Sequence, residues 1–270
     1  MKKYLEIIKK VVRIIFFVLI GVFFVFVAIK LVTMHKKYSI NEKAVNISIF
    51  TYHEVVPDAG KVVEKFMQIP EDKFENQITG LQYLGFNVIR YSDLIGYYAG
   101  DQTLSQYNYI ITFDDGYESV YKYAYPIIKS REIPITIFVI DEKVGTEGYL
   151  SWNQLKEMEE SGLVDVYTHG LDHEDSTKLS AEELLNRVNI AEDNLIMALG
   201  ISNRPKVFAY PYGKYTDEQL SLLKENGYIQ NLMDDKTNVS SKTDLYVLHR
   251  SYAYNDSLLE LVVKQLIRGI

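Results

Sequence analysis

The sequence predicts an α/β fold, an irregular (β/α) barrel with about seven strands preceded by one N-terminal transmembrane helix. Residues Ile14 to Ile29 contain no charged or strongly polar side chain. From about Ser39 onward, β-rich runs alternate with helix-like stretches, which indicates βα units and a mainly parallel sheet. Roughly seven or eight such units fit into residues 38–270, and that number favours a closed barrel over an open sheet.

The apolar segment is long enough to cross a membrane. With Lys30 included it extends to Met34 and has 21 residues, about 31 Å as a helix against a hydrocarbon core of about 30 Å. A cleaved signal peptide is the alternative. It is disfavoured because the run exceeds a typical signal core and because Phe26 and Ala28 make a poor cleavage site. More basic residues precede the span than follow it, so we expect a single-pass cell-membrane anchor with residues 38–270 outside the cell.

The net charge of −7 is divided unevenly along the chain. Residues 1–37 hold eight basic side chains and the single acid Glu6, a net +7, so residues 38–270 carry −14. An acidic body argues against a nucleic-acid partner, which requires a basic face. The chain has no cysteine, and this excludes disulfides, thiolate metal sites and a cysteine nucleophile.

The elements after the apolar segment follow one another with short connections. Glycines at 162, 200 and 227 mark helix ends, and Ser180 followed by Glu183 indicates a helix start. We expect an anchor at 1–37, a linker at 38–45 and one domain at 46–270. The expected strands are Ile47–Tyr52, Asn87–Arg90, Tyr109–Phe113, Ile135–Ile140, Val164–Tyr167, Val207–Tyr210, Tyr228–Leu232 and Tyr246–His249. The expected helices are Pro70–Leu84, a short one from Ser92, Val120–Ser130, Ser151–Ser161, Ala181–Leu199, Asp217–Asn226 and Leu258–Arg268.

Two adjacent carboxylates follow the strand at Tyr109–Phe113. Asp114 and Asp115 precede Gly116. A helix cap or a turn would explain the glycine and one of the two aspartates, but not both aspartates. Two carboxylates side by side repel each other, and a cation would relieve this. One of them would then bind the cation while the other remains free as a base.

Two of the five histidines also follow a strand. His169 and His173 are four residues apart, a spacing that suits two imidazole ligands of one metal ion. Together with Asp115 they make three ligands and leave a position for water, which is typical of a catalytic metal site. A metal there lowers the pKa of water, and Asp114 is placed to take its proton.

Two further strand ends are ambiguous from the residues alone. Phe208 to Gly213 is either a tight turn or a loop that offers a backbone N–H to an oxyanion. His53 ends the first strand, and its surroundings in the sequence do not separate a packing role from a catalytic one.

These motifs resemble those of the polysaccharide deacetylases of carbohydrate esterase family four, the NodB-homology domains, over about Asn46 to the C-terminus. The resemblance implies Asp114 as the base and Asp115, His169 and His173 as ligands of one divalent metal, most often zinc, with cobalt or nickel as alternatives. It also implies that the backbone N–H of Tyr212 stabilises the oxyanion. Residues that would line the substrate groove are Trp152, Tyr210 and Pro211.

The general-acid histidine of this family has two candidates. His249 occupies the usual late place in the chain, whereas His53 occupies the place found in a circularly permuted branch that includes poly-N-acetylglucosamine deacetylases. Only about one helix remains after His249, so His53 is favoured and His249 is held in reserve. Arg250 is expected to orient Asp114.

The chain departs from the family pattern at two positions. Gly170 stands where serine or threonine is usual, and Tyr210 stands where many members have an arginine against the base. Neither change affects an expected ligand. The resemblance implies a membrane-anchored N-deacetylase that acts on an extracellular polysaccharide, with poly-N-acetylglucosamine favoured. Peptidoglycan is the alternative substrate, and an inactive carbohydrate-binding surface protein is the alternative of another class.

Overall fold

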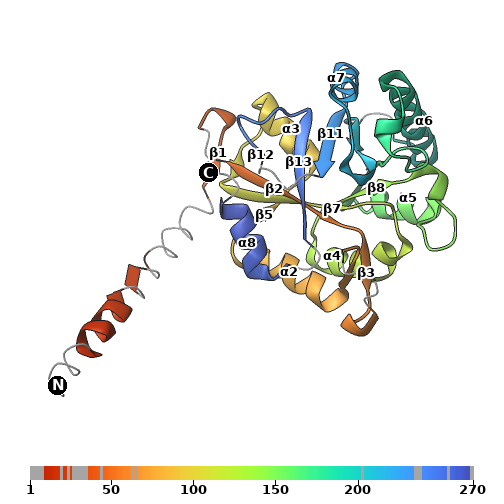
Figure 1. The fold of residues 1–270 in the computed structure, drawn as a ribbon. Helices are drawn as coiled ribbons and strands as arrows, with labels where there is room; N and C mark the ends of the chain where they lie inside the picture. The colour runs from red at the N-terminus through yellow and green to blue at the C-terminus, as the bar shows by residue number, and fades with distance from the viewer. Residues whose placement is uncertain are drawn as a thin grey trace.

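Seven parallel strands close into a barrel in the computed structural model, which describes residues 9–18, 21–22, 25, 36–42, 45–61, 64, 66–201, 204–233, 239–253 and 256–267 (Figure 1). Around the barrel they run in the order β2 (Asn46–Tyr52), β7 (Tyr107–Phe113), β8 (Ile135–Val139), β9 (Val164–Thr168), β10 (Val207–Ala209), β11 (Ile229–Met233) and β13 (Val247–Tyr252). β13 pairs with β2 and so closes the ring. The predicted barrel is therefore confirmed.

Shorter strands lie at the margins of this barrel. β5 (Asn87–Val88) runs parallel to the first part of β7, so the strand predicted at Asn87–Arg90 is an edge strand. β12 (Val239–Ser240) pairs antiparallel with the start of β2. Two small sheets join β3 (Glu54–Val56) to β4 (Gln68–Pro70) and β1 (Lys37–Tyr38) to β6 (Leu104–Ser105).

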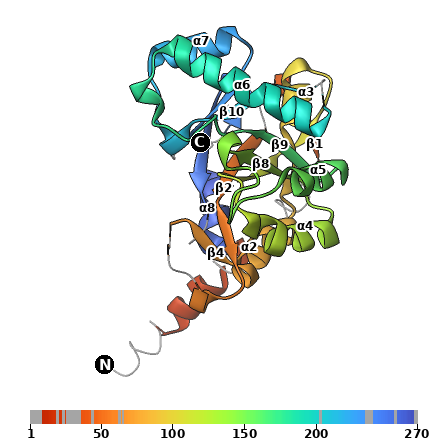
Figure 2. The ribbon, with the colours of Figure 1, turned by 90° about the vertical axis from the view of Figure 1, so that its right-hand side faces the viewer.

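The helices surround the strands (Figures 1 and 2). They are α2 (Glu71–Tyr83), α3 (Tyr91–Ala99), α4 (Tyr125–Arg131) after a π-helical segment (Val120–Ala124), α5 (Trp152–Glu160), α6 (Ala181–Leu199), α7 (Asp217–Glu225) and α8 (Leu258–Ile267). Short 3₁₀ turns occupy Ile40–Glu42, Ala59–Lys61, Asp141–Lys143, Ser176–Lys178 and Pro211–Gly213. The side chain of Ser180 caps α6 by accepting the Glu183 N–H, as its sequence predicts.

Strand alternation sets which side chains enter the barrel. Ile49, Ile110 and Phe138 come from the alternate positions of β2, β7 and β8, and they form one buried cluster with Tyr91 of α3. The same alternation continues to the carboxyl ends of the strands, where polar side chains follow the apolar ones. The barrel interior is thus a packed apolar core that gives way to a polar pocket at the carboxyl ends of the strands.

The other face of each strand packs against the helices. Phe50, Phe113 and Ile137 belong to a second buried cluster that includes Phe74 of α2 and Leu261 of α8. A third cluster joins β10 and β11 to α6 and α7. Because both strand faces are covered, the backbone at the strand ends is held rigidly on both sides.

The predicted membrane span lies largely outside the described residues. Positions 19–20, 23–24 and 26–35 of that segment are not among them. In the part of the chain that the structure describes, no helix has the length and apolarity that a membrane crossing requires.

A half-buried carboxylate on α5, that of Glu159, predicts a pH-dependent stability. Glu159 accepts the backbone N–H of Val166 at 2.8 Å, and burial, partly offset by Arg204, raises its pKa to about 7. The folded state therefore holds this proton more tightly than the unfolded state, so stability is lost as the pH rises through about 7. In urea unfolding, we expect the free energy of unfolding of Glu159→Gln, measured relative to that of the parent chain, to increase by about 1–2 kcal/mol from pH 5 to pH 8. A difference that stays constant with pH would contradict this.

Candidate active site

The Asp114–Gly116 turn directs two carboxylates into the pocket. It follows β7 directly, and Asp115 has a left-handed backbone with φ of 69°. Gly116 has φ of 79°, and a Cβ there would lie 3.0 Å from a methyl of Val139. Both aspartates are buried, at 3% and 4% exposure. The turn thus needs its glycine, and it brings two carboxylates to the carboxyl end of one barrel strand.

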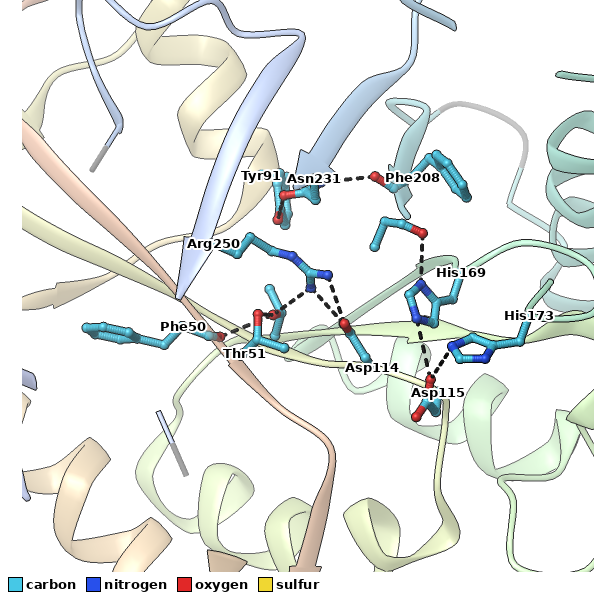
Figure 3. A network of polar contacts seen from close by, with 12 residues as sticks. Phe50, Thr51, Tyr91, Asp114, Asp115, His169, His173, Phe208, Asn231 and Arg250 are labelled. Atoms are coloured by element: carbon cyan, nitrogen blue, oxygen red, sulfur yellow. Dashed lines mark hydrogen bonds and ion pairs between the residues drawn. The ribbon is translucent and has the colours of Figure 1, made fainter. Parts of the chain in front are cut away.

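Asp114 forms a two-pronged ion pair with Arg250 of β13 (Figure 3). Arg250 Nη1 donates to Asp114 Oδ1 at 2.7 Å and Nη2 donates to Oδ2 at 2.8 Å. Nη1 also donates to the hydroxyl of Thr112 at 3.2 Å. The guanidinium lies over the ring of Phe138, 5.1 Å from its centroid. Both carboxylate oxygens are therefore fixed in direction.

The surroundings of Asp114 keep it ionised. Burial alone would raise its pKa, but Arg250, with His169 and His53, outweighs burial and holds the pKa of Asp114 below its ordinary value. A carboxylate that stays charged inside the barrel is available as a proton acceptor.

The imidazoles of His169 and His173 converge on Asp115 (Figure 3). The Nε2 atoms of His169 and His173 lie 3.4 and 3.3 Å from Asp115 Oδ1. His173, like Asp115, has a left-handed backbone, with φ of 62°. Of the four described non-glycine residues with positive φ, three lie at this site, and Tyr212 is the third of them. Strained backbone collects here because it aims side chains at one point.

The chemistry of these three donors fits a metal ion. His169 Nδ1 lies 2.8 Å from the carbonyl oxygen of Ala209, which only accepts, so Nδ1 carries the proton and Nε2 presents a lone pair to Asp115. Asp115 Oδ1 is buried without a hydrogen-bond partner in the described part of the chain. One ligand atom from each residue lies within 4.8 Å of the others. Lone pairs that face one another across a few ångströms are satisfied by a cation between them.

The pKa shifts show the same need for positive charge. Burial would lower the pKa of His169, but Asp114 and Asp115 outweigh it and hold the pKa above its ordinary value. Burial would raise the pKa of Asp115, but the two imidazoles outweigh burial and hold this pKa well below its ordinary value, so Asp115 stays ionised. A metal ion would supply that positive charge in place of a proton.

A cavity of about 140 Å³ joins these groups. Its lining comes from several strand ends: His53, Met67, Asp114, Asp115, His169, His173, Tyr210, Tyr212, Gly213, Met233, Arg250 and Tyr252. Polar groups from the ends of five barrel strands, β2, β7, β9, β10 and β13, therefore face one small space at the carboxyl end of the barrel.

The two candidate acids occupy different places. His53 lines the cavity and is 8% exposed, and its ring lies 6.2 Å from that of Tyr252. Burial lowers the pKa of His53, with Asp114 and Asp115 acting in the opposite direction. His249 precedes the inward-facing Arg250 on β13, so its side chain is on the other face of the strand, and it is not part of the cavity lining.

The expected groove residues are only partly at the cavity. Tyr212 is 61% exposed, and its ring lies 4.5 Å from that of His173. Tyr210 borders the cavity but is buried, and its hydroxyl donates to Gln230 at 2.6 Å. Pro211 lines a small neighbouring cavity instead. Trp152 begins α5 and packs against the core, outside the lining residues.

Three lining residues were missed by sequence reasoning. Met67 precedes β4, Met233 ends β11 and Tyr252 ends β13. Tyr252 was within reach, because it lies two positions after Arg250 and so shares its strand face. The two methionines carry no polar signal that would have marked them.

Comparisons with known proteins indicate the class of protein to which this barrel and its site belong. Residues 101–230 match the family of polysaccharide deacetylases. Residues 101–230 therefore form a polysaccharide deacetylase domain, and the match supports a deacetylase of the hydrolase class and is consistent with the resemblance to carbohydrate esterase family four.

Individual relatives agree in sequence and in fold. The poly-beta-1,6-N-acetyl-D-glucosamine N-deacetylase of Staphylococcus aureus (strain MRSA252) is 27% identical over 212 residues, 73% of this chain and 72% of that protein. The solved structure of IcaB from Ammonifex degensii is 27% identical, with a TM-score of 0.69, and the match covers 82% of this chain and 97% of that one. The Streptococcus pyogenes deacetylase PplD in complex with acetate shares the fold, with a TM-score of 0.73, 23% identity and 82% and 98% coverage.

Proposed function

We propose that the chain is a metal-dependent N-deacetylase that removes N-acetyl groups from amino sugars of an extracellular poly-N-acetylglucosamine. The observation that carries this is the arrangement of Asp115, His169 and His173 beside Asp114 and His53 in one cavity. The substrates in the names of the Staphylococcus aureus relative and the family support the polymer class.

The three ligands present two nitrogens and one oxygen, a set suited to zinc and also to cobalt or nickel. A divalent metal held there supplies Lewis-acid chemistry that polarises the acetyl carbonyl and acidifies water. Asp114 accepts the proton of the attacking water, and Arg250 keeps that carboxylate charged and oriented. The backbone N–H of Tyr212 donates to the oxygen that becomes negative.

The carbon–nitrogen bond then breaks, and the products are acetate and a free amine. In this proposal His53 gives the amine nitrogen its proton, because an amide nitrogen is a poor leaving group when unprotonated. The burial that lowers its pKa makes protonated His53 a stronger acid, which suits this transfer.

The choice between the two histidines is directly testable. We expect His53→Gln to lower kcat for acetate release from N-acetylglucosamine oligomers by about 10²–10⁴-fold. The loss should be smaller for an aryl acetate ester, whose leaving group needs no proton. His249→Gln is the matched control on β13 and should change kcat less than about twofold. A larger loss at His249 than at His53 would reverse the assignment.

The substrate is tested by acetate release from purified polymers. Full-length protein with zinc restored should release acetate from poly-N-acetylglucosamine faster than from peptidoglycan. A preference for peptidoglycan would contradict the proposed polymer, and glycan binding without acetate release would contradict the proposed enzyme.

We also propose that the N-terminal segment anchors the domain to the cell membrane with residues 38–270 outside. The basic flank before the apolar run supports this orientation. Protease added to intact cells should digest the body, and a body that stays intact under conditions where a known surface protein is cleaved would contradict it.

A further inference from the structure

Tyr117, two residues after Asp115, stacks on Tyr149, and this pair is here called the tyrosine ridge. The rings of Tyr117 and Tyr149 lie 5.1 Å apart at 22°. Their backbones form an antiparallel bridge, in which Leu150 N–H donates to the Gly116 carbonyl and Glu118 N–H donates to the Gly148 carbonyl, both at 2.9 Å. The ridge is therefore held by main-chain bonds and not only by its own stacking.

Among the described residues, Tyr117 has fewer ring and cation contacts than Tyr149. Lys143 Nζ lies 5.8 Å from the centroid of the Tyr149 ring, and Tyr149 stacks on Tyr117. Within the described ranges, no second ring or cation lies against Tyr117, which is half-buried. A planar aromatic face of this kind is suited to the C–H face of a sugar ring.

Glu54 stands next to this ridge. β3 continues from β2 (Figure 1), and the N–H of Val55 donates to the hydroxyl of Ser119 at 3.3 Å, which ties β3 to the segment after Tyr117. The Glu54 carboxylate is half-buried and accepts one hydrogen bond, from Gln68 Nε2 at 3.3 Å. No cationic side chain pairs with it in the part of the chain that the structure describes.

The ridge and the Glu54 carboxylate adjoin the cavity along the chain, because Tyr117 lies two residues after Asp115 and Glu54 directly follows His53, and both Asp115 and His53 line the cavity. Burial and then Asp115 and Glu54 raise the pKa of the Tyr117 hydroxyl, and burial and Asp115 raise that of Glu54. Tyr117 and Glu54 therefore lie close to residues that line the cavity, although neither is part of its lining. Neither Tyr117 nor Glu54 has a role in the proposed deacetylation mechanism.

We propose that Tyr117 and Glu54 form a subsite for the sugar unit adjacent to the one that reacts. The ring of that unit stacks on Tyr117, and its hydroxyl or amino groups donate to the Glu54 carboxylate. The inference rests on the proposed function and adds to it a preference for chains over single sugars. A half-buried carboxylate without a cationic partner beside an aromatic face is a common way to bind a polyhydroxylated ring.

The test compares chain lengths. The readout is the ratio of kcat/KM for acetate release from a β-1,6-linked N-acetylglucosamine pentamer to that from the monosaccharide, with full-length protein and zinc restored. Tyr117→Ala and Glu54→Gln should each lower this ratio about tenfold. Tyr117→Phe keeps the ring and should keep the ratio.

A matched control uses the second stacked pair, Tyr121 and Tyr125, whose rings lie 5.6 Å apart at 24°. Tyr121→Ala should leave the ratio unchanged. Circular dichroism and metal content show whether each variant is folded and loaded, and Glu54→Gln, which preserves shape, keeps the test valid if Tyr117→Ala misfolds. Acetate release by the parent chain with a ratio that neither substitution changes would overturn the subsite alone. No acetate release from any oligomer would overturn the proposed function with it.

Discussion

Asp115→Asn is expected to abolish both metal binding and acetate release. The substitution removes the anionic ligand between two imidazoles that lie 3.3 and 3.4 Å from its oxygen. We expect metal content to fall from about one ion per chain to near zero, and kcat to fall by about 10³-fold or more. Elemental analysis of the purified protein and an acetate assay measure the two effects together.

Asp172→Asn is the matched control for this prediction. Asp172 lies between the two histidines in the sequence, but its carboxylate pairs with Arg187 and not with them. This variant should retain its metal. Full metal content and activity in Asp115→Asn would show that the three residues are not the metal site.

Arg250→Met is expected to produce the largest loss of stability. It leaves the Asp114 carboxylate buried at 3% exposure without its counter-ion, and breaking such a pair costs about 3–5 kcal/mol. Urea unfolding measures this directly. Arg131→Met is the control, because its ion pair with Glu75 is exposed and is expected to contribute less than about 1 kcal/mol.

The same substitution should change the pH dependence of activity. In the parent chain Arg250 helps to hold the pKa of Asp114 below its ordinary value. Without Arg250, burial acts unopposed by that charge, the pKa rises, and Asp114 becomes protonated at higher pH. The acid limb of kcat/KM should therefore move to higher pH in Arg250→Met, and by a smaller amount in Arg250→Lys, which retains the charge but loses the two-pronged geometry. An unchanged limb would mean that Asp114 is not the base.

Much of the fold was predictable because parallel strands buried on both faces leave strong apolar runs. Each barrel strand coincides with a predicted run to within about two residues at most ends. The exceptions have physical causes. The run at Asn87–Arg90 forms only the two-residue strand β5, which pairs with the start of β7 at the margin of the barrel. β12 and β6 have two residues each, too few for a periodic signal.

The site was partly predictable for a different reason. Asp114, Asp115, His169 and His173 lie in short contiguous motifs, so their sequence spacing alone places them at strand ends. The Arg250 contact is long-range, 136 residues from Asp114, and depends on barrel closure through β13 and β2. Trp152 and Pro211 were placed by family pattern, and neither lines the cavity, because the backbone conformation at these positions decides where their side chains point and no local pattern encodes it.

The central claim is that Asp115, His169 and His173 hold a metal that deacetylation requires. The most direct measurement is acetate release from poly-N-acetylglucosamine by full-length protein stripped of metal and then titrated with zinc. We expect no release from the stripped protein and full release at about one zinc per chain. Undiminished release from protein that contains no metal would contradict the claim.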